Sequence, residues 1–283
     1  MRLDGRREST NVEDRRGKKM GAGLGIGGVI ILGIIALLLG KNPFETIQDI
    51  NLETTGTETE YTPSAEEEEE LASFTKKILA GTEDVWTDEF NKMGKKYIAP
   101  KLMLFSNATQ SGCGSATSST GPFYCSADQT VYIDLSFFTT MKQQFGTAGD
   151  FAYAYVIAHE VGHHVQYLLG TLDDAHEKMS RVSKTESNKI SVRLELQADF
   201  YAGVWANKDN SKFNSLEPGD IQEGLDIASR IGDDYLQKRA KGYTVPESFN
   251  HGTSAQRSKW LMKGFKTGNI NDGDTFSPAY ENL

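Results

Sequence analysis

Residues 159 to 163 read His-Glu-Val-Gly-His, a spacing at which two imidazoles can share one metal ion. On an α-helix, residues four apart lie on the same face, so His159 and His163 can present ring nitrogens to a single cation. Glu160 lies one step round the helix, where its carboxylate can act as general base on a water at that metal. The pattern is typical of zinc hydrolases and predicts two ligands of one Zn²⁺ ion and one catalytic residue.

The segment around this motif, residues 151 to 170, is apolar enough to form a buried helix. Asp150 is expected to cap its start, and Gly170 is expected to end it in a left-handed conformation. Burying the polar motif requires partners, because an unpaired buried polar group costs on the order of a few kcal/mol. A bound metal is one such partner, and hydrogen bonds to core neighbours are the alternative. His164 points about 100° away from the preceding residue and is expected to be structural or exposed.

A second predicted helix, residues 190 to 205, offers a third ligand. Zinc in hydrolases takes three protein ligands and keeps one position open. Glu195 and Asp199 are four residues apart, so both carboxylates share a face of this helix. Glu195 fits as the third ligand, and Asp199 would accept the other ring N–H of His159. An ordinary exposed acidic pair is the alternative. Small residues would let this helix approach its partner closely: Ala198, Ala202 and Gly203.

A third group of candidate residues lies near the C-terminus. Thr253 and Gln256 form a capping box, which predicts a helix through residue 265. His251 lies in the loop before that helix, where it can donate a hydrogen bond to a developing oxyanion, although a structural role is equally compatible. Arg257 could assist that stabilisation or orient a carboxylate.

The remaining pattern predicts one strand and two further helices in this part of the chain. Residues 129 to 134 alternate as a strand does, and residues 135 to 145 are typical of a helix. Another helix is predicted from residue 220 to about 239. The strand lies just upstream of the motif helix, so we expect it to be a sheet edge to which an extended peptide could add.

Residues 21 to 40 contain no charged side chain, and a helix of that length matches the thickness of a bilayer core. Residues 1 to 20 hold seven Lys or Arg against four Asp or Glu, and the segment after the apolar stretch is acidic. The positive-inside rule therefore predicts a single-pass membrane helix with a cytoplasmic N-terminus and an extracytoplasmic domain. A cleaved signal peptide is the competing interpretation, but no small-x-small cleavage site follows Leu39.

The acidity of the chain is concentrated after this helix. Residues 41 to 70 hold one Lys against ten Asp or Glu, so the net charge of −9 says little about the substrate. The Thr- and Glu-rich composition of residues 51 to 63 is typical of a disordered tether. Ser64 and Glu67 form a capping box, so the folded domain is expected to begin near Ser64. Basic residues of the folded part are scattered without a docking motif, so no nucleic-acid partner is expected.

The only two cysteines are Cys113 and Cys125. In an exported domain such a close pair should be oxidised, and closing this short loop contributes roughly 3 kcal/mol in the chain-entropy model. A zinc-binding pair is the alternative, but two further ligands nearby are lacking. A disulfide is therefore predicted.

The chain resembles the family of neutral zinc metallopeptidases, membrane-anchored bacterial proteins related in motif to the glutamate-liganded zincins. The resemblance covers nearly the whole chain and rests on six segments: 121–128, 131–138, 158–166, 191–199, 231–237 and 251–257. It implies zinc binding and peptidase-like chemistry. Family members often carry a further cysteine pair at the positions that here hold Phe200 and Gly273, so one crosslink is missing.

These observations together predict an α+β, mainly helical protein in four parts. They are a basic cytoplasmic tail (1–20), a transmembrane helix (21–40), an acidic flexible linker (41–63) and a zincin-like metallopeptidase domain with a small sheet (64–283). The expected function is zinc-dependent hydrolysis of peptide bonds in extracytoplasmic proteins or peptides. Two alternatives are a zinc amidase that acts on cell-wall peptides and a membrane-tethered assembly factor whose zinc is structural. A carboxylate-binding cleft near Arg193 or Arg257 would favour the amidase.

Overall fold

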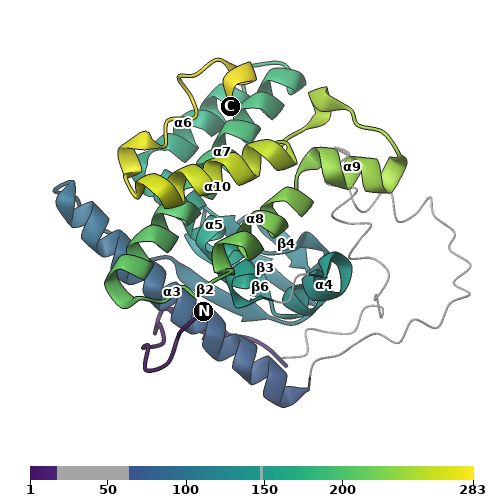
Figure 1. Ribbon diagram of the computed structural model, residues 1–283. Helices are drawn as coiled ribbons and strands as arrows, with labels where there is room; N and C mark the ends of the chain where they lie inside the picture. The colour runs from purple at the N-terminus through teal and green to yellow at the C-terminus, as the bar shows by residue number, and fades with distance from the viewer. Residues whose placement is uncertain (18–63, 147–148) are drawn as a thin grey trace, which may run out of the picture.

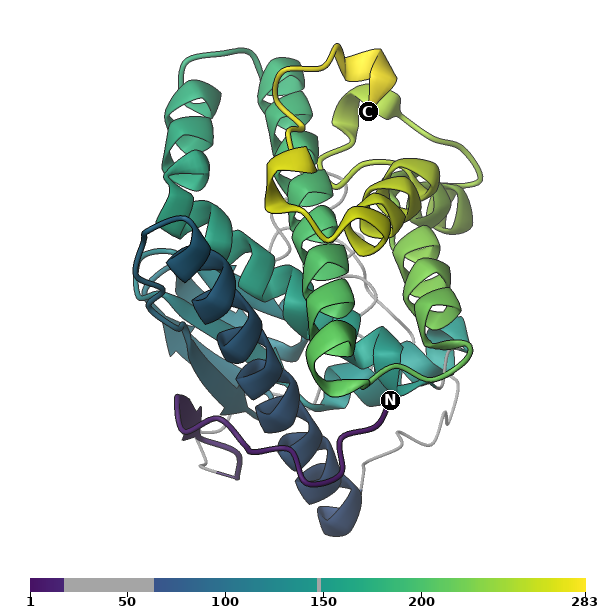
Figure 2. The same ribbon diagram turned by 60° about the vertical axis from the view of Figure 1, so that its left-hand side comes forward.

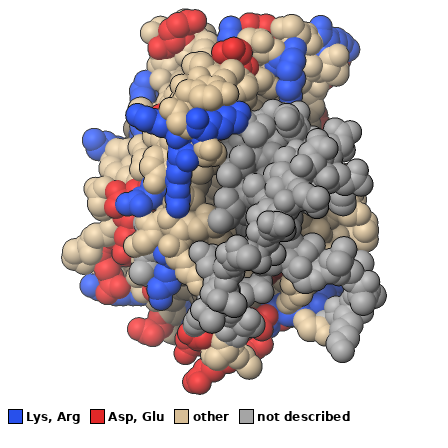
Figure 3. Space-filling view, turned by 90° about the vertical axis from the view of Figure 1, so that its right-hand side faces the viewer, with Lys and Arg blue, Asp and Glu red and all other residues tan. Residues whose placement is uncertain are grey.

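Helices make up most of the described chain, and a small sheet lies along one side of them (Figure 1). The structure is a computed structural model that describes residues 1–17, 64–146 and 149–283. The expected mainly helical α+β fold with a small sheet is confirmed for these residues. On the face drawn in Figure 3, basic and acidic side chains both occur, so no single sign of charge dominates the described surface there.

The main sheet has four strands in the order β1-β2-β6-β5. β1 pairs parallel to β2, β2 pairs parallel to β6, and β5 pairs antiparallel to β6. A separate hairpin of β3 and β4 follows β2. The strand bounds are β1 (Val12–Asp14), β2 (Lys101–Phe105), β3 (Ala108–Ser111), β4 (Gly114–Thr117), β5 (Phe123–Cys125) and β6 (Thr130–Asp134).

Eight α-helices lie within the described ranges, and several begin and end where their capping residues predict. Ser64 and Glu67 form the expected capping box at the start of α3, and Thr253 and Gln256 form the one at the start of α10. The bounds are α3 (Ala65–Lys92), α4 (Ser136–Phe145), α5 (Asp150–Leu169), α6 (Thr171–Met179), α7 (Lys184–Phe213), α8 (Asp220–Arg230), α9 (Asp233–Lys241) and α10 (Ser254–Thr267). Four short 3₁₀ turns occur at 118–120, 246–248, 270–272 and 280–282.

Helix α7 packs against both α5 and α10, and glycines allow the close approach on each side. A Cβ added to Gly162 on α5 would lie 2.9 Å from the backbone oxygen of Ala198 on α7. A Cβ added to Gly203 on α7 would lie only 2.2 Å from the backbone oxygen of Leu261 on α10. Gly162 lies inside the His-Glu-Val-Gly-His motif, so the motif itself contains the residue that admits α7.

Three details differ from the sequence-based predictions. The helix expected over residues 220–239 is broken into α8 and α9, because the backbone of Gly232 is extended and forms the N-cap of α9. The strand predicted at 129–134 is β6, which lies inside the sheet, so the outer strand beside α5 is β5 instead. The N-cap of α5 is Gly149, one residue before the predicted Asp150.

The membrane helix predicted at residues 21–40 and the tether at 41–63 lie outside the described residues. Among the helices of the described ranges, none is both long enough and apolar enough to cross a bilayer. The two positions at which family members often carry the further cysteine pair both lie among the described residues. A Cβ at Gly273 would lie 2.6 Å from the ring of Phe200, so these two positions are in direct contact.

The packing of α7 on α10 yields a first prediction. In Gly203→Ala, the new methyl group would meet rigid backbone atoms of α10, so the free energy of unfolding should fall by about 1–3 kcal/mol. Thermal or urea denaturation measures the change. Thr185→Ala, an exposed change on the same helix, is the control and should stay within about 0.5 kcal/mol of the wild type. Equal stabilities of the two variants would contradict the close packing.

Candidate metal centre

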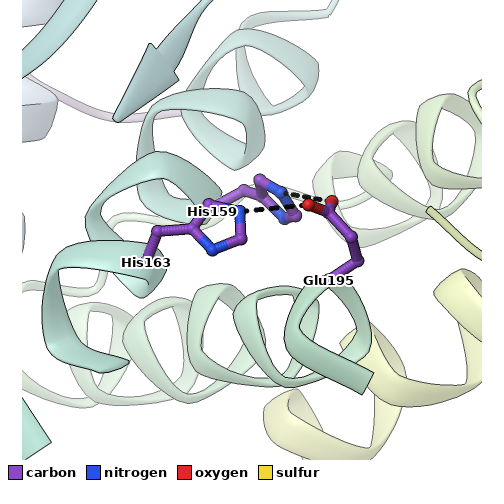
Figure 4. A group of neighbouring side chains, drawn as sticks. All are labelled: His159, His163 and Glu195. Carbon is purple, nitrogen blue, oxygen red and sulfur yellow. Dashed lines mark ion pairs between the residues drawn. The ribbon is translucent and has the colours of Figure 1, made fainter. Parts of the chain in front are cut away.

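The three predicted ligands come together between α5 and α7 (Figure 4). Nε2 of His159 lies 3.2 Å from one carboxylate oxygen of Glu195, and Nε2 of His163 lies 3.4 Å from the other. One ligand atom from each residue falls within 4.8 Å of the other two. Zn²⁺ with tetrahedral bonds of about 2.1 Å separates its ligand atoms by roughly 3.4 Å, so this donor set fits a zinc ion.

The ring of His159 is oriented by a hydrogen bond between its Nδ1 and Asp199, as the sequence predicted. Its Nδ1 lies 2.8 Å from a carboxylate oxygen of Asp199, which is fully buried. In this arrangement Nδ1–H donates to the carboxylate, and the Nε2 lone pair is directed at the metal position. Burial alone lowers the pKa of His159, but Asp199 and Glu195 outweigh it and raise the pKa to about 10 when no metal is bound.

Asp199 in turn depends on two residues of the neighbouring helices. Nε and Nη2 of Arg257 on α10 donate to its two oxygens at 2.8 and 2.9 Å, and the hydroxyl of Tyr155 on α5 donates at 2.5 Å. Burial tends to raise the pKa of Asp199, yet Arg257 and then His159 hold it below the usual range. Asp199 is therefore a charged group inside the core, and three helices share it.

His163 has its own supporting residue, which the sequence analysis did not assign. Its Nδ1 lies 2.8 Å from Oε1 of Gln166, three residues later on α5. Gln166 is fully buried, and its amide nitrogen donates to the backbone oxygen of Leu194 at 2.7 Å. This bond ties the support of one ligand to the backbone beside Glu195. The only sign of this support in the sequence is that Gln166 follows His163 at the i, i+3 spacing of a helix.

Glu160 lies beside the ligands and is also buried. Burial raises the pKa of its carboxyl group, although His159 and His163 act in the opposite direction. The backbone of Tyr124 on β5 also acts to lower this pKa. The general base predicted from the sequence is thus positioned between the metal ligands and the outer strand of the sheet.

His251 and Arg257 occupy different surroundings, although the sequence grouped them. His251 lies at the wall of a cleft, with its Nδ1 3.2 Å from Asp233 and its side chain 35% exposed. Burial lowers the pKa of His251, but Asp233 and Glu195 together raise it above the ordinary value. Arg257 is only 3% exposed, and its guanidinium is directed at Asp199.

His164 has a structural position. It is fully buried, with Nδ1 2.9 Å from the hydroxyl of Tyr124 and Nε2 2.7 Å from the backbone oxygen of Ile98. Burial lowers its pKa to about 4, so the neutral ring accepts from Tyr124 and donates to Ile98. It fastens the motif helix to β5 and to the segment before β2.

The metal centre opens into a cleft of about 680 Å³. Aromatic and aliphatic side chains from α4, α6 and α9 form much of its wall: Phe137, Phe145, Leu172, Met179 and Leu236. The predicted disulfide between Cys113 and Cys125 is confirmed, and it ties the β3-β4 turn to β5 at the rim of this cleft. His176, to which the sequence analysis gave no role, also lines the cleft.

The raised pKa of His159 yields a prediction about zinc binding. At pH 7 the metal-free ring is protonated, and zinc needs its Nε2 lone pair, so binding should release about one proton per ion. Calorimetric titration in two buffers of different ionisation enthalpy measures this number. Glu195→Gln should weaken binding strongly, whereas Glu186→Gln, an exposed change on the same helix, should not. Tight binding without proton release would contradict the assigned geometry.

The family to which the chain is similar is also named for zinc. A family model described as "Putative neutral zinc metallopeptidase" matches residues 1–276. The protein "Uncharacterized protein YpfJ" of Escherichia coli K12 is 45% identical over 288 residues, which cover 99% of this chain and 100% of that protein. "Uncharacterized protein Mb2605" of Mycobacterium bovis is 45% identical over 193 residues, 65% of this chain and 64% of that one. No solved structure gives a significant match. Because the family model spans almost the whole chain, this protein belongs to the neutral zinc metallopeptidase family.

Proposed function

We propose that this chain is an active zinc-dependent peptidase that cleaves peptide bonds in proteins or peptides. The observation that carries the proposal is the position of Glu160, a buried carboxylate beside a three-ligand site that opens into a cleft. Three protein ligands with a carboxylate next to them are the arrangement of catalytic zinc sites, whereas structural sites use four protein ligands.

The proposed mechanism assigns a separate task to each residue. His159, His163 and Glu195 would hold one zinc ion, which supplies Lewis acidity to a water molecule and to the scissile carbonyl. Glu160 accepts the proton of the attacking water and later returns it to the leaving amine. The raised pKa of Glu160 lies closer to neutral pH than the pKa of an ordinary glutamate. This suits a group that must both take and give a proton.

His251 is the proposed donor to the tetrahedral oxyanion. Because Nδ1 is engaged by Asp233, Nε2 is the nitrogen left to face the cleft, and the raised pKa of His251 favours the ring that carries a proton there. Asp233 also accepts hydrogen bonds from the backbone nitrogens of Asn250, His251 and Gly252, which fixes the loop. A donor held in place before the reaction stabilises developing charge best.

Arg257 is assigned a positioning role in this proposal, in place of the catalytic role considered from the sequence. Its two hydrogen bonds to Asp199 leave the guanidinium occupied, and it supports His159 through that carboxylate. Arg193 donates a hydrogen bond to the backbone oxygen of Thr275. Arg193 does not line the cleft, and the guanidinium of Arg257 is directed at Asp199, so this arrangement favours the peptidase over a cell-wall amidase.

The proposed site of action is extracytoplasmic. The disulfide between Cys113 and Cys125 supports this assignment, because such bonds persist in oxidising compartments and are rare in the cytosol. The outer strand β5, which this bond restrains, lies next to the metal centre and offers a sheet edge for an extended substrate.

Replacing the general base tests the mechanism. Glu160→Gln should keep its zinc, since the ligands are unchanged, but kcat/KM for peptide cleavage should fall by about 10²–10⁴. Metal analysis and a peptide assay on the full chain measure both quantities. Glu177→Gln, an exposed change on α6, is the matched control and should leave both unchanged. A Glu160→Gln protein with full zinc and full activity would refute the assignment.

The apolar wall of the cleft predicts a preference for large apolar side chains. Peptides with Leu or Phe beside the scissile bond should be cleaved about 10-fold or more faster than matched peptides with Ser, because a buried apolar group contributes about 1–3 kcal/mol. Phe137→Ser should reduce this ratio. Tyr243→Ser, an exposed aromatic outside the cleft, should not. Equal rates for the Leu and Ser peptides with the wild type would contradict the preference.

A further inference from the structure

The first 17 residues pack against the domain, where the sequence analysis expected a separate tail. We call residues 1–17 the N-terminal segment. In Figure 2 it runs across α3 towards the sheet. The backbone nitrogen of Arg2 donates to Ser215, and that of Ser9 donates to Lys76, so contacts begin at the start of the segment. β1 at its end then pairs with β2.

A buried ion pair joins this segment to α7. Nη2 of Arg6 lies 2.8 Å from Asp209, and the two side chains are only 11% and 2% exposed. The guanidinium also lies 3.7 Å from the ring centre of Phe213. A carboxylate buried to this degree needs a counter-charge, because desolvation of an unpaired charge is costly. Arg6 is the residue that supplies it.

A second buried carboxylate, Glu83 on α3, is satisfied in the same way. The hydroxyl of Ser9 donates to it at 2.5 Å and the side-chain amide of Asn11 donates at 2.8 Å. Arg7 adds an ion pair to its other oxygen at 2.9 Å. Glu83 is 8% exposed, so without the N-terminal segment this acid would lose all three partners.

The two ends of the segment are also engaged. The amino group of Met1 lies 3.2 Å from Glu217 and 3.5 Å from Asp220, at the start of α8. At the other end, β1 covers the edge of β2: the backbone nitrogen of Leu102 donates to Asn11, and that of Arg15 donates to Leu104. Uncovered sheet edges invite pairing with other chains, so β1 completes the sheet.

We propose that residues 1–17 and residues 64–283 lie on the same side of the membrane, with the N-terminal segment as a permanent part of the folded domain. One crossing of a bilayer by residues 21–40 would place the two parts in different compartments and is incompatible with these contacts. The proposal therefore departs from the cytoplasmic N-terminus expected from the distribution of Lys and Arg. It holds whether the segment binds its own domain or that of a second copy.

Labelling with a membrane-impermeant maleimide tests the shared compartment. Thr10→Cys in the N-terminal segment and Lys95→Cys in the domain each add one exposed thiol to the full chain. In intact cells the two variants should behave alike, both labelled or both protected, and in lysed cells both should react. Labelling of only one of the two in intact cells would overturn the proposal. The readout needs no enzymatic activity, so it is independent of the proposed function.

A charge exchange tests the contact itself. Arg6→Asp and Asp209→Arg should each lower the melting temperature of the full chain, and the double variant should recover most of the loss. Arg2→Asp is the matched control, because Arg2 is 54% exposed and pairs with an exposed glutamate. It should change the melting temperature little. If Arg6→Asp is as stable as Arg2→Asp, or if the double variant shows no recovery, the segment is not docked as proposed.

Discussion

The buried carboxylate of Asp199 is the group on which the geometry of the metal centre depends. It joins His159 on α5 to Arg257 on α10 while being itself part of α7. A charge in the core is tolerated only when every lone pair has a partner, so the three helices must meet in one arrangement. That arrangement also fixes Glu195, one turn earlier on α7, opposite the two histidines.

Small residues make this meeting of helices possible. Gly162 lets α7 approach α5 within the metal-binding motif, and Gly203 and Gly264 let α10 approach α7. Close backbone contact shortens the distances over which side chains must reach, so Asp199 and Arg257 make two direct hydrogen bonds. The packing of the helices therefore determines the geometry of the metal centre. With a wider helix spacing, Asp199 and Arg257 would be too far apart to pair.

The two edges of the main sheet have different neighbours. β5 faces the metal centre, whereas β2 on the other side of β6 is covered by β1. The family model begins at residue 1, and the Escherichia coli relative aligns over 99% of the chain, so the N-terminal segment belongs to the part that is shared. The N-terminal segment supplies the partners of two buried carboxylates, Asp209 and Glu83, so the domain cannot be understood from residue 64 onward alone.

Much of the site could be predicted from the sequence because its signals are local. The spacing of His159 and His163 places them on one face of a helix, the capping boxes at Ser64 and Thr253 mark helix starts, and two nearby cysteines predict a disulfide. Glu195 and Asp199 required a second helix with the same spacing. Most of these inferences used spacings within one helix or one short loop, where the order of residues largely determines the geometry.

Other features were decided only by the tertiary structure. Arg257 faces Asp199 because α10 crosses α7 at Gly203, and the side chain of Gln166 is anchored by its hydrogen bond to Leu194 on α7. The sequence alone could not tell that β5 is the outer strand beside the site, or that residues 1–17 complete the far edge of the sheet. These outcomes depend on contacts between segments that are distant in the chain. The free energy of such contacts depends on which polar groups are buried and paired in the folded protein, and this cannot be read from local sequence.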